Sequence, residues 1–443
     1  MKKLKKAIII ILILLIVLTI TLLIINKKQN ISEEDNSSND SEEIGGEIPT
    51  QYTEKGFSKV EDKSIFFTVT DCVQNYLNYI NPENNIFGYN KDYSYTDEEI
   101  EKEREQILYN CLNKDYIEKN DVNTDNVKQK VNSIDEYTVF IPKQIIEKAD
   151  TDIKKYILEG NILNSKINEK TYFIVYLDSK NSTFSIEPVY NQDSINNIDV
   201  SYNDSEIEDN IYNDYSYIES NDEDTIERYT KYIVQMVIDS PEELYNNYLN
   251  EEYKNKKFST LDSFYEYINK NKENLEGTII KKYKVNEKEN STEYICKDQY
   301  ENYYIFEEND VMNYTVVLDS YTIESNYLIG IYKNDSEQEK VQFDITQIIE
   351  ALNRKDYEYV YSKVQDSDKL ARYPTYDTFE NEIKDKFYDI NKIQFGSFYK
   401  EDNELYKYNT YITNYYDEEE NGFELEIKVN LKDNNDYEVS FIL

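Results

Sequence analysis

The sequence of 443 residues predicts an α+β protein. We expect an N-terminal transmembrane helix followed by two small domains and a third, diverged one, each with about three helices and a curved antiparallel sheet. Three observations support this. Residues 7–25 form an uncharged apolar run, a short block near residue 260 recurs near residue 375, and the apolar period after each block is two. Helices followed by alternating strands are typical of an α+β order.

The apolar run at residues 7–25 is long enough to cross a membrane, because a helix of that length covers about 28 Å of a roughly 30 Å hydrocarbon core. Four lysines lie in residues 1–6 and two follow at residues 27–28. This asymmetry makes residues 1–6 a cytoplasmic tail and puts the C-terminal domains outside. A cleaved secretory signal is the alternative, but it would be shorter and end in small residues. We therefore expect a single-pass cell-membrane protein that contacts the lipid bilayer through residues 7–25.

Two acidic segments divide the rest of the chain. Residues 26–56 are mostly polar and acidic without apolar periodicity, and residues 191–224 contain no lysine or arginine. Such segments bury too little apolar surface to order themselves, so both are expected to be linkers, the first of them disordered. The domains are then expected at residues 57–190, 225–325 and 340–443.

The first of these domains shows the same order of elements more weakly. A helix is expected over residues 60–80, and Thr96 with Glu99 forms a capping box that opens a second helix through residue 112. A short third helix over residues 124–131 precedes four alternating segments that predict strands. These segments are residues 137–141, 155–162, 171–177 and 183–189. We interpret the domain as a diverged copy of the other two with an insertion near residues 82–95.

The second and third domains contain an internal repeat at one offset of 115 residues. The block Phe258-Ser-Thr260-Leu-Asp262-Ser-Phe264 recurs as Tyr373-Pro-Thr375-Tyr-Asp377-Thr-Phe379, and Ile268 recurs as Ile383. The pattern predicts a helix start. The threonine suits the N-cap, the aspartate puts negative charge in the first turn, and the phenylalanine and isoleucine, four apart, face the core.

Helical patterns come before each block and strands after it. The helices are expected over residues 226–238 and 241–249 in the second domain, and over 343–352 and 355–364 in the third. The strands are expected over residues 278–285, 293–297, 303–306 and 314–323, and again over 393–399, 406–415, 423–431 and 437–443. Asn421-Gly422 and residues 432–436 are good hairpin connections, so the sheets should be antiparallel.

This order of elements, together with the block at Thr260 and its twin at Thr375, resembles the nuclear transport factor two-like superfamily. The resemblance covers residues 225–325 and 340–443 and implies a cone-shaped α+β fold whose curved sheet wraps a long first helix. It implies no functional residues, because this shape serves many activities.

Composition excludes several classes of function. The formal net charge of −40 repels nucleic acid, and no basic stripe offsets it, so we expect no nucleic-acid partner. The absence of histidine excludes histidine-dependent catalysis and histidine-ligated metals. No phosphate-binding or nucleophile motif is present. The sequence therefore predicts a protein that is not an enzyme, with no catalytic, cofactor-binding or metal-binding residue and no cofactor.

Two weaker signals were weighed. Cys72 and Cys111 either form a disulfide or are free buried thiols, and Cys296 has no partner in its own domain. Residues 204–209 offer alternate oxygen ligands for calcium, but they lack the glycine and the terminal glutamate of a calcium loop. A solvated linker explains that segment better.

Heavy use of tyrosine, asparagine, isoleucine and lysine with little arginine is typical of an AT-rich bacterial genome. The expected function is therefore an extracytoplasmic scaffold of the bacterial cell envelope, in which tethered domains dock other envelope proteins. The alternative is a small-ligand-binding or sensing module that uses a cone as its pocket. Packed cone interiors would favour docking, and an open cone with convergent polar groups would favour a ligand.

Overall fold

A computed structural model describes residues 48, 50–53, 55–81, 96–131, 136–148, 153–178, 180–189, 215–321, 336–402, 404–417, 421–432 and 436–442. The expected cytoplasmic tail, the expected membrane span at residues 7–25 and the insertion near residues 82–95 lie outside these residues. Within the described part of the chain, no helix is long and apolar enough to cross a membrane. We call residues 48–189, 215–321 and 336–442 the first, second and third regions.

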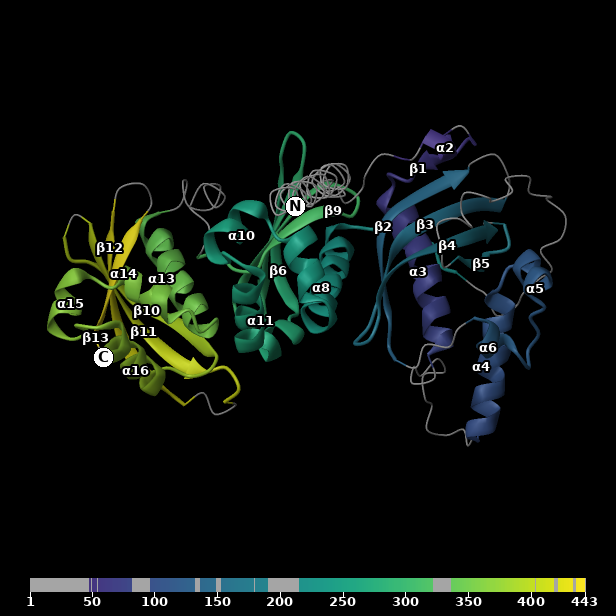
Figure 1. Cartoon of the computed structure of the whole chain (residues 1–443). Helices are drawn as coiled ribbons and strands as arrows, with labels where there is room; N and C mark the ends of the chain where they lie inside the picture. The colour runs from purple at the N-terminus through teal and green to yellow at the C-terminus, as the bar shows by residue number, and fades with distance from the viewer. Residues whose placement is uncertain are drawn as a thin grey trace, which may run out of the picture. The chain divides into compact units, whose positions relative to one another are not determined.

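The chain is α+β, as the sequence predicts, with one antiparallel sheet in each region (Figure 1). The first sheet has five strands and the other two have four, and in each sheet the strands neighbour one another in chain order. The strands are β1 (Ser58–Lys59), β2 (Val139–Lys148), β3 (Ile153–Leu163), β4 (Asn168–Asp178), β5 (Thr183–Val189), β6 (Ile280–Glu287), β7 (Thr292–Asp298), β8 (Tyr303–Asp310), β9 (Asn313–Val317), β10 (Asn391–Lys400), β11 (Leu405–Asn414), β12 (Gly422–Leu431) and β13 (Tyr437–Ile442).

Helices come before the long strands in every region. Those of the first region are α2 (Thr50–Thr53), α3 (Lys63–Ile80), α4 (Asp97–Cys111), α5 (Lys114–Asn120) and α6 (Val127–Lys130). The predicted capping box is confirmed, because the Glu99 amide donates to the Thr96 hydroxyl and the Glu99 carboxylate accepts from the Thr96 amide. The four predicted strands are also confirmed, although β2 begins later and extends further than expected.

The second and third regions have matching helices. In the second these are α8 (Asp222–Asp239), α9 (Pro241–Glu243), a five-residue π-helix η1 (Leu244–Tyr248), α10 (Glu251–Lys257) and α11 (Leu261–Glu276). In the third they are α13 (Glu337–Asn353), α14 (Tyr357–Lys363), α15 (Asp366–Ala371) and α16 (Tyr376–Lys386). The short helices α10 and α15 were not predicted, because seven or fewer residues show little periodicity.

The described structure extends into both expected linkers. Tyr52, within the predicted linker 26–56, is buried and packs together with Phe57 on Ile146 and Ile157. An isolated aromatic residue in a polar segment gives no periodic signal, so the sequence did not reveal that Tyr52 belongs to the core. In the second predicted linker, 191–224, the amide of Ile218 donates to the Thr68 hydroxyl at 3.0 Å, and α8 already begins at Asp222.

The same connection between helices and sheet recurs in all three regions. Leu112, Leu249 and Val364, each just after a helix, form parallel bridges to the last strand of their own sheet. In each case the next residue donates its amide to the bridged residue of that strand, at 2.8, 3.0 and 2.9 Å. The bridges at Leu249 and Val364 lie at the same 115-residue offset as the sequence block. The three regions therefore share one order of elements and one cross-connection.

The repeated block forms the helix start that the sequence predicts. Thr260 and Thr375 are N-caps whose hydroxyls accept from the third amide of the helix, at 3.2 Å in both copies. Phe264, Phe379 and the isoleucines that follow are buried. A third version lies in the first region, eleven residues after its bridge as in the other two.

In this third version, the side chains of Asn123 and Asn126 each accept a hydrogen bond from the backbone amide of the other, at 3.1 and 2.8 Å, and helix α6 begins at Val127. Val127 and Val131, both fully buried, replace the phenylalanine and isoleucine. Valine at this position removes the aromatic residue by which the block is recognised. The sequence alone therefore predicts only a short helix here, not a third copy of the block.

Aromatic rings pack the space between helices and sheet. In the second region Tyr229 stacks on Tyr314, with ring centroids 3.9 Å apart and planes 11° apart, and Phe306 lies 6.0 Å from both. Tyr248 completes the group at 5.3 Å from Tyr314, and all four rings are buried. Many of the tyrosines are thus core residues.

Candidate binding cleft at the junction of the second and third regions

The sequence predicts no site residue. The described residues include no group of three or more cysteines, aspartates or glutamates that could hold a metal ion. Residues 204–209, whose oxygen ligands raised the question of calcium binding, lie outside the described residues. Cys72, Cys111 and Cys296 are buried and form no disulfide, which answers the question of the disulfide left open by the sequence. Burial raises the pKa of the Cys111 thiol above its usual range, as expected for an inert core thiol.

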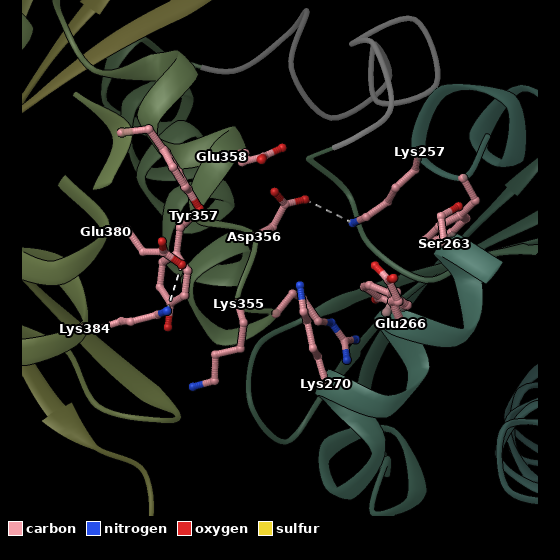
Figure 2. Close-up of a pocket in the computed structure, with 14 residues that line it drawn as sticks. Lys257, Ser263, Glu266, Lys270, Lys355, Asp356, Tyr357, Glu358, Glu380 and Lys384 are labelled. Carbon is pink, nitrogen blue, oxygen red and sulfur yellow. Dashed lines mark hydrogen bonds and ion pairs between the residues drawn. The ribbon is translucent and has the colours of Figure 1, made fainter. Parts of the chain in front are cut away.

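A cleft of about 560 Å³ lies where the second and third regions meet (Figure 2). One wall comes from the end of α10 and from α11, and the other from residues 354–358 and α16. Helices α11 and α16 are the two helices that the repeated block opens, so both copies of the block contribute to one cleft. Its lining residues are Lys257, Phe258, Ser263, Glu266, Tyr267, Lys270, Arg354, Lys355, Asp356, Tyr357, Glu358, Tyr376, Glu380 and Lys384.

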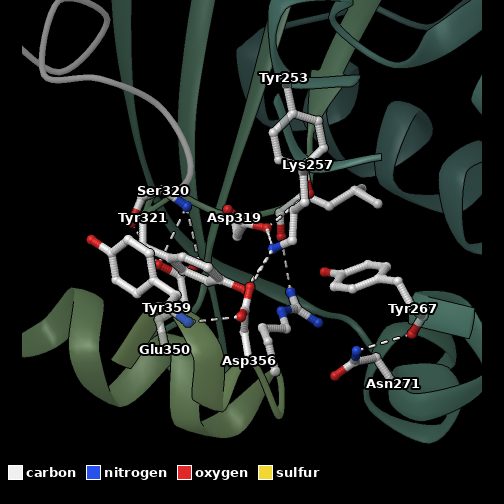
Figure 3. A network of polar contacts seen from close by, with 12 residues as sticks. Tyr253, Lys257, Tyr267, Asn271, Asp319, Ser320, Tyr321, Glu350, Asp356 and Tyr359 are labelled. Carbon is white, nitrogen blue, oxygen red and sulfur yellow. Dashed lines mark hydrogen bonds and ion pairs between the residues drawn. The ribbon is translucent and has the colours of Figure 1, made fainter. Parts of the chain in front are cut away.

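Lys257 joins the two walls. Its ammonium donates to the carboxylate of Asp319, which is fully buried, and to the Tyr321 hydroxyl at 2.5 Å (Figure 3). The Tyr253 hydroxyl donates to the same Asp319 carboxylate at 2.8 Å. Asp356, from the other wall, lies 3.6 Å from the ammonium. Lys257 therefore pairs with two carboxylates, the buried one of Asp319 and the partly exposed one of Asp356.

Arg354 is the most deeply buried cation of the cleft, with 1% of its surface exposed. Its Nη2 donates to the Tyr304 hydroxyl at 2.7 Å and to the Leu318 carbonyl at 3.2 Å, which ties the third region to strand β8 and the end of β9. Its Nε and Nη1 have no hydrogen-bond partner among the described residues. A buried guanidinium keeps its charge, so these N–H groups are costly to leave unpaired.

A second unpaired group lies on the opposite wall. The hydroxyl of Tyr267, a buried residue of α11, has no hydrogen-bond partner in the part of the chain that the structure describes. Its backbone carbonyl accepts from the Asn271 amide at 3.0 Å, as Figure 3 shows. Burial raises the pKa of the Tyr267 phenol well above its usual value, so the hydroxyl remains a neutral donor. The positive charge of Arg354 acts on it in the opposite direction.

Glu350 is a buried residue of α13, one helical turn before Arg354, and it bonds across the junction. Its carboxyl accepts from the Tyr303 amide at 2.9 Å and from both the amide and the hydroxyl of Ser320, at 3.3 and 2.5 Å. Burial raises the pKa of this carboxyl to about 8, and the nearby Asp319 adds to the shift. Glu350 is therefore mostly protonated near neutral pH, which removes one charge from the junction.

The remaining charges in the cleft are of both signs. Lys384 pairs with Glu380 at 2.7 Å, and Lys355 donates to Asp389 at 3.0 Å. Lys270 makes no hydrogen bond or ion pair with any described residue, and Figure 2 joins it to no neighbour. The exposed carboxylates of Glu266 and Glu358 are equally unpaired in the described part of the chain. A larger hollow of about 750 Å³ over β10–β12 has two glutamates and no cation in its lining.

Charged contacts also join the first and second regions. Arg228 forms two hydrogen bonds with Asp71, and Lys63 donates to Glu308 at 2.5 Å. The buried Glu308 also accepts from the hydroxyl of Tyr229 at 2.5 Å. Both junctions therefore hold buried or half-buried carboxylates that would be costly to leave without partners.

One signal in the sequence could have drawn attention to these sites. Only four arginines occur in the chain, against many lysines, and two of them, Arg228 and Arg354, hold the two junctions. Lysine cannot replace arginine where a planar, multidentate donor is needed. A rare arginine in a lysine-rich chain therefore indicates such a position.

No family model matches the chain, and neither a curated protein nor a solved structure shows significant similarity to it. The function is therefore argued from the residues themselves.

Proposed function

We propose that this chain is a single-pass, membrane-anchored scaffold of the bacterial cell envelope whose domains dock other envelope proteins outside the membrane. The apolar run at residues 7–25 and the lysine excess at residues 1–6 support the anchor and its orientation. The net charge of −40 suits a tethered domain that must stay soluble.

The fold that we propose for each region is the cone-shaped nuclear transport factor two-like one. The parallel bridge recurs in all three regions, and a hydrogen bond across the block, from the residue at position 4 to the side chain at position 1, recurs with it, which supports a third, diverged copy in the first region. A meander of four antiparallel strands after the helices agrees with that fold.

The packed interior of the second region is the observation that carries the docking proposal. Tyr229, Tyr248, Phe306 and Tyr314 occupy the space between helices and sheet, where a cone-pocket protein would hold its ligand. Ion pairs such as Arg228 with Asp71 connect neighbouring regions and suit a rigid body. Rigid, filled domains present preformed outer surfaces, which favours protein partners.

In-cell crosslinking with mass spectrometry of the full chain tests the proposal. We expect crosslinks from residues 215–442 to other envelope proteins, and recovery of cytoplasmic proteins alone would contradict it. Protease added to wall-stripped intact cells tests the topology. It should digest residues 215–442, and protection of these residues would contradict an extracytoplasmic location.

Ligand binding remains a second candidate because of the junction cleft. Its unpaired Arg354 and Tyr267 groups favour a polar ligand there, whereas the packed rings argue against a ligand inside a cone.

A further inference from the structure

The cleft between α11 and α16 contains unsatisfied donors that converge from both walls. Within the described residues, Arg354 has two nitrogens without a hydrogen-bond partner, and Tyr267 has a hydroxyl without one. Both residues line the same cleft, and both are more than nine-tenths buried. Native proteins rarely leave such groups unpaired, and the exceptions mark a bound water, an ion or a functional site. An oxyanion held near both residues would give each a partner.

The charges of the outer cleft narrow the class of that ligand. Lys270 is a cation without an ion pair among the described residues, and Glu266 and Glu358 are carboxylates without one. Asp356 and Glu380 add two more carboxylates, which already pair with lysines. The lining also has five cations, of which Lys257, Lys355 and Lys384 already pair with carboxylates. A dianion such as phosphate would meet Arg354 and Lys270, but it would also meet the carboxylates of Glu266 and Glu358, and like charges in a partly enclosed cleft cost free energy. A ligand with one anionic and one cationic end could place the anionic end at Arg354 and Lys270 and the cationic end at the glutamates.

The size and the apolar parts of the cleft agree with a small organic ligand. Its volume of about 560 Å³ lies within the range of small-molecule sites. Phe258, Tyr357 and Tyr376 contribute rings to the lining. Such rings provide apolar contact for a side chain while charged groups hold its two ends.

We propose that the cleft binds a zwitterion of the amino-acid class, either a free amino acid or a short peptide. The ligand carboxylate lies at Arg354 and Tyr267, with Lys270 adding positive charge, and its ammonium group lies at the glutamates Glu266 and Glu358. The proposed ligand binding goes beyond the scaffold function. Docking of protein partners would use the outer surfaces and would not require a ligand in the cleft.

The test measures thermal stability and heats of binding for the full-length protein in detergent micelles. Four probes are compared: a mixture of the twenty amino acids, trialanine, the same amino acids N-acetylated, and inorganic phosphate. We expect stabilisation by the first or the second probe, and which of them binds identifies a free amino acid or a peptide. Acetylation removes the ammonium group and should weaken binding at least tenfold, as expected for one lost charged contact.

Three variants locate the site. Tyr267→Phe keeps the ring and removes only the hydroxyl, and Lys270→Gln changes an exposed side chain, so both should fold normally. Each should weaken binding about tenfold, and Lys272→Gln, on the same helix but outside the cleft, should not change it. The proposal is overturned if no zwitterion binds, if phosphate or the acetylated mixture binds as well, or if Tyr267→Phe and Lys270→Gln bind as the parent does. Docking of protein partners can fail or succeed independently of these results.

Discussion

Arg228 and Asp71 form a two-pronged ion pair, with Nη1 2.6 Å from Oδ1 and Nη2 2.8 Å from Oδ2. The guanidinium also lies 4.6 Å from the centre of the Phe67 ring. The pair joins α8 to α3, two helices separated by the predicted linker at residues 191–224. Planar pairing of this kind fixes direction as well as distance.

We expect Asp71→Asn to lower the free energy of unfolding by about 1 kcal/mol, because the pair is half-buried and part of its energy is screened by water. Urea unfolding followed by circular dichroism measures this. Glu61→Gln, at an exposed position just before α3, is the matched control. An effect of equal size in both variants would mean that the pair contributes nothing specific.

The block phenylalanines should be essential to their domains. Phe264→Ala and Phe379→Ala each remove a fully buried ring and should cost about 3–5 kcal/mol. In the first region Val127→Ala should cost about 2 kcal/mol, since it removes a smaller buried side chain at the matching position. Thr260→Ala and Thr375→Ala should cost about 1 kcal/mol each as lost caps. Denaturant midpoints measure all five, and an unchanged midpoint for Val127→Ala would reject its equivalence to the phenylalanines.

Glu350 should make stability depend on pH. Its pKa in the folded protein is about 8, above the usual value of 4.5, so the folded protein holds a proton that the unfolded chain releases. The contribution of Glu350 to the free energy of unfolding is therefore complete below the pKa of the unfolded state. It declines as the pH rises through the pKa of the folded state. Glu350→Gln cannot titrate. Relative to the parent, the variant should gain stability between about pH 5 and pH 9, and parallel stability curves would contradict the assignment.

Gly160 should not tolerate a side chain. A Cβ there would lie 2.6 Å from the Phe140 ring and against the Ile141 carbonyl oxygen of the paired strand β2. Because the contact includes backbone, Gly160→Ala should destabilise by about 1–3 kcal/mol or more. Gly277→Ala is the control, since its nearest contact is 3.3 Å and its φ is −88°, and it should change stability by less than about 1 kcal/mol. Thermal unfolding compares the two.

The sequence predicted the long elements well, because capping residues and apolar periods act locally. Thr96 with Glu99 and the block threonines specify helix starts within four residues of chain, and the strands follow from alternation. Elements that depend on distant partners were missed. Strand β1 has two residues and exists only through its pairing with β2, and Tyr52 is buried only because the first sheet covers it.

The candidate cleft could not be predicted for the same reason. Tyr267 is one of 46 tyrosines, and nothing near it in the chain distinguishes it from the others. Its relation to Arg354 depends on the packing of the second region against the third, and no local pattern encodes that packing. The rarity of arginine is the one sequence signal that pointed to this junction.

The parallel bridges at Leu112, Leu249 and Val364 also bear on the order in which the chain can mature. Each bridge joins residues about 70 positions apart and uses the last strand to be synthesised in its region. The connection after the helices therefore acquires its partner only when nearly the whole region has left the ribosome or the translocation channel. Until then the amides of Asn113, Asn250 and Gln365 depend on water. Each region is thus expected to gain its final stability late and in one step, which favours sequential completion of the three regions from the N-terminal side.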